Sequence, residues 1–110
     1  MNRTAFAFEG PPELQAPIEQ ALRRVVDPEV ALNIVDVGLV YGVSVDEKRV
    51  HVRLTMTSAA CPVADVIIGD IEQQLDRAVP ADLLIQVEMV WEPPWTPERL
   101  SDSAKRFMGW

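Results

Sequence analysis

The sequence predicts a small single-domain α+β protein in which helices pack on one face of a three-stranded mixed sheet. The chain has 110 residues, which is a usual length for one domain. Apolar residues recur at helical spacing in some segments and alternate with polar residues in others. These segments follow in the order helix, strand, strand, helix, strand, helix, and two consecutive strands among helices are typical of an α+β domain.

The first half of the chain is expected to contain an arm, a helix and a hairpin. Residues 1–12 end in Gly10, Pro11 and Pro12, which predicts a flexible arm before a domain at residues 13–110. An amphipathic helix follows and ends before Pro28, because the residue preceding a proline is disfavoured in a helix. Strands are expected at residues 39–45 and 49–57, and the short polar turn 46–48 between them can join only antiparallel neighbours. The apolar positions of the helix are Leu14, Ile18, Ala21, Leu22 and Val25.

The second half is expected to contain a helix, a strand and a short last helix. Pro62 suits the first position of a helix that ends near Pro80. A third strand follows, and Thr96 is then the expected N-cap of the last helix, with Pro97 as its first residue. The apolar stripes are Val63, Ile67, Ile71 and Leu75 in the helix, Ile85, Val87, Met89 and Trp91 in the strand, and Leu100, Ala104 and Phe107 in the last helix.

Charge and composition exclude several classes of function. The formal net charge is -7 and the pI about 4.5. This balance argues against nucleic-acid binding, which needs basic residues to neutralise phosphates, and against binding to anionic membrane surfaces. The sequence has no apolar run long enough to span a bilayer and no secretory signal. A single cysteine cannot form an intrachain disulfide, so we expect a cytoplasmic protein.

Cys61, the single cysteine, is the residue with the clearest chemical potential. It is expected at the N-terminus of the second helix, where backbone N–H groups and the helix dipole favour the thiolate, although Asp65 opposes this. Iron–sulfur clusters and structural zinc usually take four protein ligands, and the chain offers one cysteine and one histidine. A metal or cluster bound through Cys61 would therefore be shared with a second subunit, a client protein or a small thiol. The alternative is that Cys61 is a small buried hydrophobic residue.

The other candidate residues each have a structural interpretation beside the functional one. His51 could form a dyad with Cys61, but it falls on the polar face of a strand, where polar residues are expected anyway. Acidic residues between the first helix and the first strand could supply oxygen ligands, although such residues in connectors more often cap helices. Hydroxyl residues near Cys61 could bind a ligand or serve as strand residues. The acidic residues are Asp27, Glu29 and Asp36, and the hydroxyl residues are Thr55, Thr57 and Ser58.

Four short segments, in their order along the chain, resemble one known family. They are Asp27-Pro28-Glu29, residues 33–41 with Asn33, Asp36 and Gly38, residues 54–57 with Thr55 and Thr57 followed by Cys61-Pro62, and Pro94-Trp95. The chain resembles the MIP18-like, or DUF59, family of iron–sulfur cluster assembly factors, which includes SufT-like and PaaD-like proteins and the N-terminal domain of Mrp-like ATPases. The resemblance covers residues 14–109.

The resemblance implies an accessory factor that delivers or inserts iron–sulfur clusters into client apoproteins, without catalysis. Cys61 would contact the iron, and Asp36 and Thr57 would contribute to the cofactor site. No permanent cofactor is expected. The resemblance implies at most a transient or shared iron–sulfur cluster. The implied partners are client apoproteins and the iron–sulfur assembly machinery, and a homodimer would bring two Cys61 thiols to a shared site.

Two other functions fit the sequence. PaaD-like members suggest a non-catalytic assembly subunit for a multicomponent oxygenase, although these 110 residues, with one cysteine, contain no segment like the cysteine-rich extension of those proteins. A cysteine-dependent enzyme would need an exposed thiol of low pKa paired with His51.

Overall fold

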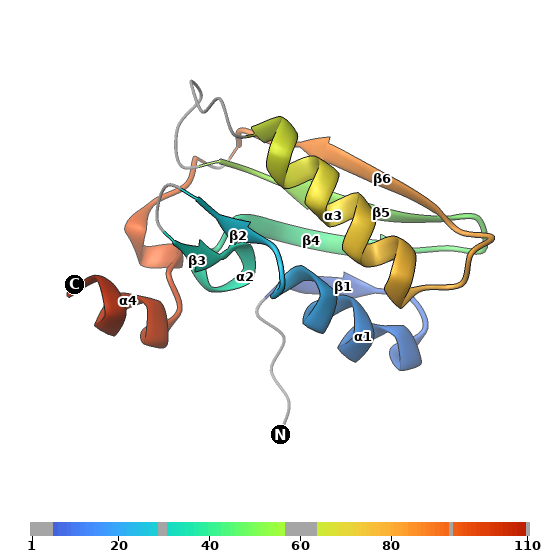
Figure 1. Ribbon diagram of the computed structural model, residues 1–110, viewed down its shortest axis with the longest axis horizontal. Coiled ribbons are helices and arrows are strands. Elements are labelled where there is room, and N and C mark those ends of the chain that lie inside the picture. The colour runs from blue at the N-terminus through green and yellow to red at the C-terminus, as the bar shows by residue number, and fades with distance from the viewer. Residues whose placement is uncertain (1–5, 29–30, 57–63, 93, 110) are drawn as a thin grey trace.

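The computed structural model describes residues 6–28, 31–56, 64–92 and 94–109 (Figure 1). Helices and strands follow one another as the α+β prediction requires, so the fold class is confirmed. The elements are β1 (Ala7–Glu9), α1 (Pro12–Leu22), β2 (Val26–Asp27), β3 (Leu32–Asn33), α2 (Ile34–Val37), β4 (Val40–Val45), β5 (Arg49–Leu54), α3 (Ala64–Ala78), β6 (Leu84–Met89), the 3-10 helix η1 (Pro97–Arg99) and α4 (Asp102–Met108).

The main sheet is mixed, and it has four strands in the order β1-β4-β5-β6 instead of the three expected. β4 and β5 form the predicted antiparallel hairpin, whereas β1 pairs with β4 and β6 with β5 in parallel. The additional strand, β1, lies within the segment that we expected to be a flexible arm. Phe6 is buried and Phe8 packs against the core, so this segment contributes apolar surface that an arm would leave in water.

Two other segments differ from the expectation. The connector before β4 contains a small antiparallel pair, β2 and β3, and one turn of helix, α2. The last helix does not begin at Thr96 and Pro97, because Pro97 belongs to η1. Instead α4 begins at Asp102, and the Ser101 side chain accepts a hydrogen bond from the backbone N–H of Ala104 at 3.1 Å, as an N-cap residue does.

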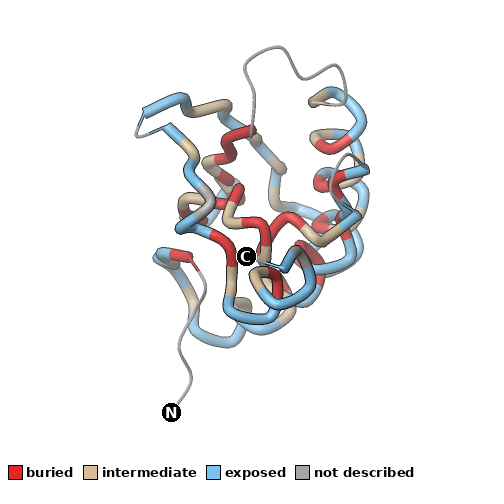
Figure 2. The backbone as a smooth tube through the Cα atoms, turned by 90° about the vertical axis from the view of Figure 1, so that its left-hand side faces the viewer, coloured by how far each residue is buried: buried red, intermediate tan, exposed pale blue. Residues whose placement is uncertain are grey.

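The hydrophobic core lies between the sheet and two helices. α1 and α3 cover one face of the sheet, while α2 and α4 lie at one end of it (Figure 1). Figure 2 shows the buried positions concentrated in the middle of the molecule. In α3 the buried residues recur every four positions, as the sequence predicts: Ile67, Ile71 and Leu75. From the sheet, Val43, Val50, Val52 and Leu54 face these helices and are fully buried.

The opposite face of the sheet carries polar side chains and is called the open face below. Burial alternates along β5 and β6, so every second residue points away from the core. The outward positions of these strands are Arg49, His51, Arg53, Leu84, Gln86 and Glu88. A sheet with one covered and one solvated face is the usual arrangement in small α+β domains.

Candidate functional site

The motif residues that the structure describes gather at one end of the sheet, where β4 begins and β5 and β6 end (Figure 1). On either side of the segment that contains Cys61, the described residues are the buried Met56 and Ala64, the first residue of α3. Five of the candidate positions lie outside the described residues: Glu29, Thr57, Ser58, Cys61 and Pro62.

Asp27 lies in the interior of this end of the molecule, with 0% of its surface exposed. Its backbone oxygen accepts a hydrogen bond from Ala31 at 2.8 Å, and Ala31 has a φ of 59°, in the left-handed region found in tight turns. Buried polar groups in proteins are usually hydrogen-bonded or paired with a charge. Asp27 takes part in a further interaction of this general kind within the protein. Asp27 is therefore part of the framework of the β2–β3 region, whereas the adjacent Pro28 is exposed.

Asn33 and Asp36 cap the short helix α2 reciprocally. The Asn33 side-chain oxygen accepts the backbone N–H of Asp36 at 2.9 Å, and its amide nitrogen donates to Oδ2 of Asp36 at 2.8 Å. The Nη1 atom of Arg23, just after α1, donates to Oδ1 of Asp36 at 3.0 Å. The backbone oxygen of Asp36 accepts the N–H of Ser101 at 2.8 Å. Asp36 thus connects α1, α2 and the C-terminal segment.

These contacts keep Asp36 ionised. Partial burial raises the pKa of Asp36, but hydrogen bonds from Asn33 and Arg23, the charge of Arg23 and a hydrogen bond from Ser101 outweigh it, so the pKa lies below its ordinary value. Both carboxylate oxygens already accept hydrogen bonds. Asp36 would have to give up these bonds to act as a metal ligand.

Gly38 and Trp95 attach the C-terminal segment to α2. Gly38 ends the helix with a φ of 84°, a conformation that glycine adopts without strain. A Cβ atom at Gly38 would lie 2.7 Å from the Cβ atom of Arg99, so the motif glycine allows η1 to approach the helix. The indole nitrogen of Trp95 donates to the backbone oxygen of Val37 at 2.8 Å. These two motif positions therefore have a structural explanation.

Thr55 lies where the chain leaves β5 toward Cys61, and it is buried. Its backbone N–H donates to the oxygen of Leu39 at 2.8 Å, and the N–H of Val90 donates to the oxygen of Leu54 at 2.7 Å. Backbone hydrogen bonds from both neighbouring segments thus hold the end of β5 in place. Thr55, like Gly38 and Trp95, therefore has a structural explanation.

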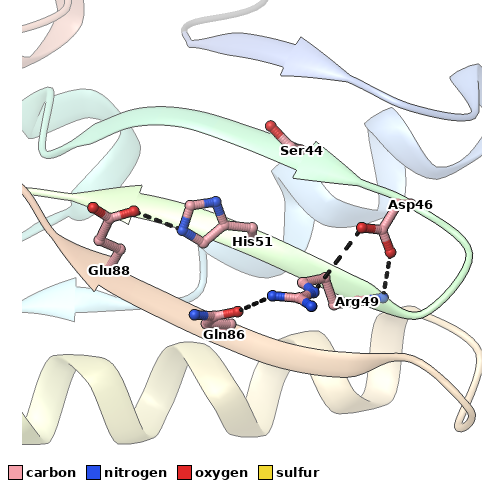
Figure 3. Close-up of a pocket in the computed structure, with 6 residues that line it drawn as sticks. All are labelled: Ser44, Asp46, Arg49, His51, Gln86 and Glu88. Carbon is pink, nitrogen blue, oxygen red and sulfur yellow. Dashed lines mark hydrogen bonds and ion pairs between the residues drawn. The ribbon is translucent and has the colours of Figure 1, made fainter.

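His51 lies on the open face, where its Nε2 atom is 2.8 Å from a carboxylate oxygen of Glu88 on β6 (Figure 3). Arg49 on the same face donates from Nη1 to the Gln86 side chain at 2.9 Å and lies 4.0 Å from Asp46. His51 therefore has a carboxylate partner from the neighbouring strand. In the described ranges, His, Cys, Asp and Glu side chains form no group of three that could bind a metal ion.

The sequence analysis did not single out a pocket on the open face, close to the ends of β5 and β6. The pocket is lined by Tyr41, Arg53, Val90, Glu92 and Arg99, so it brings two guanidinium groups together. The sequence analysis named only His51 on this strand face. One residue in the sequence could have indicated the pocket. Gly42, which has no side chain, lies opposite Arg53 in the β4–β5 ladder.

Comparison with known proteins relates this architecture to one family. A family model described as "Iron-sulfur cluster assembly protein" matches residues 15–88. The chain belongs to this family. The match includes the motif residues from Asp27 to Pro62 and the strands that surround them.

Relatives and solved structures agree with this membership. The chain is 40% identical over 97 residues to the Fe-S protein maturation auxiliary factor YitW of Bacillus subtilis, an alignment that covers 87% of this chain and 94% of that protein. It is 41% identical over 86 residues to SufT of Staphylococcus aureus, which carries the same description, covering 77% and 97% of the two chains. A DUF59 domain from Bacillus anthracis superimposes with a TM-score of 0.82 at 40% identity, covering 88% of this chain and 92% of that domain.

A further solved structure, a conserved hypothetical protein from Thermotoga maritima, has a TM-score of 0.73 at 34% identity and covers 93% of this chain and 97% of its own. Among the described helices of the present chain, none has the length and apolar character needed to cross a membrane. The family relationship thus extends over nearly the whole fold and supports the α+β architecture described above.

Proposed function

We propose that this protein is an accessory factor in iron–sulfur cluster assembly that delivers or inserts clusters into client apoproteins, with Cys61 as its iron contact. The observation that carries the proposal is the match over residues 15–88 to the iron–sulfur cluster assembly family. Relatives at 40% and 41% identity are described as Fe-S protein maturation auxiliary factors, a description that names a supporting role.

Cys61 is the candidate contact because thiolates are the usual protein ligands of iron–sulfur clusters and the chain contains one cysteine. A cluster needs further ligands, and the described residues contain no group of metal-binding side chains that would supply them. The missing ligands would come from a second subunit, a client protein or a small thiol. Such a shared cluster is transient, which suits transfer to a client.

Asp36 and Thr57 have a supporting role in this proposal. The hydrogen bonds of Asp36 to Asn33 and Arg23 support α2 beside the end of β5. Backbone bonds from Thr55 and Val90 hold the end of β5, from which the chain continues to Thr57 and Cys61. Clients and the iron–sulfur assembly machinery are the proposed partners, in keeping with the descriptions of the relatives.

The test compares the wild-type gene with Cys61→Ser and a gene deletion in the source organism under iron limitation. The activities of iron–sulfur enzymes are expected to fall in the deletion strain and to be restored by the wild type but not by Cys61→Ser. Ser44→Ala, a small change on the open face, is the control and should restore activity. Unchanged activity in the deletion strain would refute the proposed function.

Anaerobic reconstitution with iron and sulfide tests the role of Cys61 directly. A cluster absorbance in the wild type that is lost in Cys61→Ser is expected, and the mass in solution then shows whether two chains share the cluster. Cluster formation in Cys61→Ser equal to that of the wild type would remove Cys61 as the iron contact.

A further inference from the structure

Two arginines that form no ion pair with any described residue meet in one pocket on the open face. Arg53 comes from β5 and Arg99 from η1, and they line the pocket with Tyr41, Val90 and Glu92. The cavity has a volume of about 280 Å³ and is open to solvent. It lies at the same end of the sheet as the motif residues, but on the face that the helices leave uncovered.

Gly42 and Tyr41 place the two guanidinium groups. Gly42 is opposite Arg53 in the β4–β5 ladder, and a Cβ atom on Gly42 would lie 3.0 Å from the Cζ atom of Arg53. The guanidinium of Arg53 therefore packs against the backbone of Gly42. The ladder is irregular between Val40 and Gly42, as at a β-bulge, and such irregularities redirect side chains. The Cζ atom of Arg99 lies 4.1 Å from the centroid of the Tyr41 ring, in a cation–π contact.

Neither arginine is bound to a carboxylate within the described part of the chain, although Glu88, which pairs with His51, lies opposite Arg53 in the β5–β6 ladder. Neither Arg53 nor Arg99 takes part in an ion pair there, whereas Arg23 and Arg49 do. The Nε atom of Arg53 is buried and has no hydrogen-bond acceptor. Among the described residues that line the pocket, Glu92 is the one acidic residue. Two ordered cations facing one carboxylate leave an excess positive charge, which favours an anionic ligand.

A carboxylate is the anion that fits this pocket best. The planar guanidinium fork matches a carboxylate in two parallel hydrogen bonds. The net charge of -7 repels large polyanions at long range, so the pocket suits a single carboxylate. Because the cavity is open, a group that protrudes from a larger surface fits it better than an enclosed small molecule.

We propose that Arg53 and Arg99 bind a single aspartate or glutamate side chain that protrudes from the surface of a partner protein. That this partner is a client apoprotein rests on the proposed function, whereas the carboxylate site itself does not. Tyr41 and Gly42 are positioning residues in this site, because they act through the guanidinium groups.

The test uses an acetylated and amidated hexapeptide that contains one glutamate among glycines, titrated into the whole protein. Binding is followed by isothermal titration and by the Nε–Hε signals of the arginines in NMR spectra. Arg53→Met and Arg99→Met are each expected to weaken binding about tenfold or more, as is usual when a charge-assisted bidentate pair is lost. Arg24→Met is the control, because it removes the same charge from an exposed position after α1 and should change binding less than about twofold.

Two further variants separate geometry from charge. Gly42→Ala keeps both arginines but places a methyl group where the Arg53 guanidinium lies, so it should also weaken peptide binding. Arg53→Lys keeps the charge and loses the fork, and should bind more weakly than the wild type. Thermal unfolding followed by circular dichroism shows that each variant is folded at the temperature of the titration.

Equal binding of the glutamate peptide to Arg53→Met and to the wild type would overturn the proposal. So would binding of a matched glutamine peptide as tight as that of the glutamate peptide, or binding of inorganic phosphate tighter than that of the glutamate peptide. Iron–sulfur enzyme activities in cells that carry Cys61→Ser separate the two proposals. Peptide binding that depends on Arg53, together with full enzyme activity in Cys61→Ser cells, would support this site and refute the proposed function. Loss of enzyme activity in Cys61→Ser cells, together with no binding of the glutamate peptide to the wild-type protein, would support the proposed function and refute this site.

Discussion

Replacing Gly38 by alanine is expected to lower the free energy of unfolding by about 2 to 4 kcal/mol. Gly38 has a φ of 84°, and this left-handed conformation costs a residue with a Cβ atom about 1 to 2 kcal/mol. The new methyl group would also lie 2.7 Å from the Cβ atom and 2.9 Å from the carbonyl carbon of Arg99. Moving η1 away from such a contact costs about 1 to 3 kcal/mol, and the lower entropy of the unfolded chain offsets about 0.4 to 1 kcal/mol.

Two other glycines serve as matched controls for the same substitution. Gly109 has a φ of 77° with no atom within 4 Å of an added Cβ, so Gly109→Ala isolates the backbone strain and should cost about 1 kcal/mol. Gly69 lies inside α3 with open space around it, so Gly69→Ala should stabilise the protein by about 0.5 to 1 kcal/mol.

Urea unfolding followed by far-UV circular dichroism measures all three variants. With an m-value of about 2 kcal/mol/M, Gly38→Ala should lower the midpoint by about 1 to 2 M. An equal loss in Gly38→Ala and Gly109→Ala would show that the approach of Arg99 contributes nothing. Destabilisation by Gly69→Ala would contradict the open surroundings of that residue.

Two further substitutions test the contacts that hold α2. Asp36→Asn should cost about 1 to 2 kcal/mol at pH 7, because it removes the charge that Arg23 and Asn33 stabilise. Since the folded-state pKa of Asp36 lies below its ordinary value of 3.8, this stability is present above that pH and is lost as the pH falls through the folded-state pKa. Urea midpoints of wild type and variant should therefore converge in acid, and a constant difference down to about pH 2 would contradict the ionic contribution. Trp95→Phe should cost about 0.5 to 1.5 kcal/mol through the lost bond to Val37, and an unchanged midpoint would show that this bond is not stabilising.

Local patterns were sufficient to predict the helices and strands that form the core. In α3 the spacing of Ile67, Ile71 and Leu75 places them on one stripe, and all three are fully buried. The hairpin of β4 and β5 was predictable because Asp46 is a turn former, and its side chain accepts the backbone N–H groups of Lys48 and Arg49.

Segments whose structure depends on distant partners were not predictable in the same way. β1 has three residues, too few for alternation to be recognised, and it forms by pairing Phe8 with Val43 far along the chain. The helix α2 is a single turn, stabilised by Asn33 and Arg23 from outside it. A prediction based on local periodicity treats such segments as an arm or a connector.

The candidate site shows the same division. Asp36, Gly38 and Trp95 were found through the family resemblance, but their contacts became visible only in the structure. The sequence analysis did not predict that Arg53 and Arg99 line the same pocket, because the two residues come from different elements and meet only in the folded chain.

Gly38 connects the stability of the motif region to the proposed carboxylate site. The residue that an added methyl group at Gly38 would displace is Arg99, whose guanidinium lies over Tyr41 in the pocket. Gly38→Ala should therefore weaken binding of the glutamate peptide even at a temperature where the variant is fully folded. Gly109→Ala should lower stability without changing that affinity, because nothing in the described structure contacts the added group. Wild-type affinity in folded Gly38→Ala would mean that Arg53 binds the carboxylate without Arg99, and the second guanidinium would then have no part in the site.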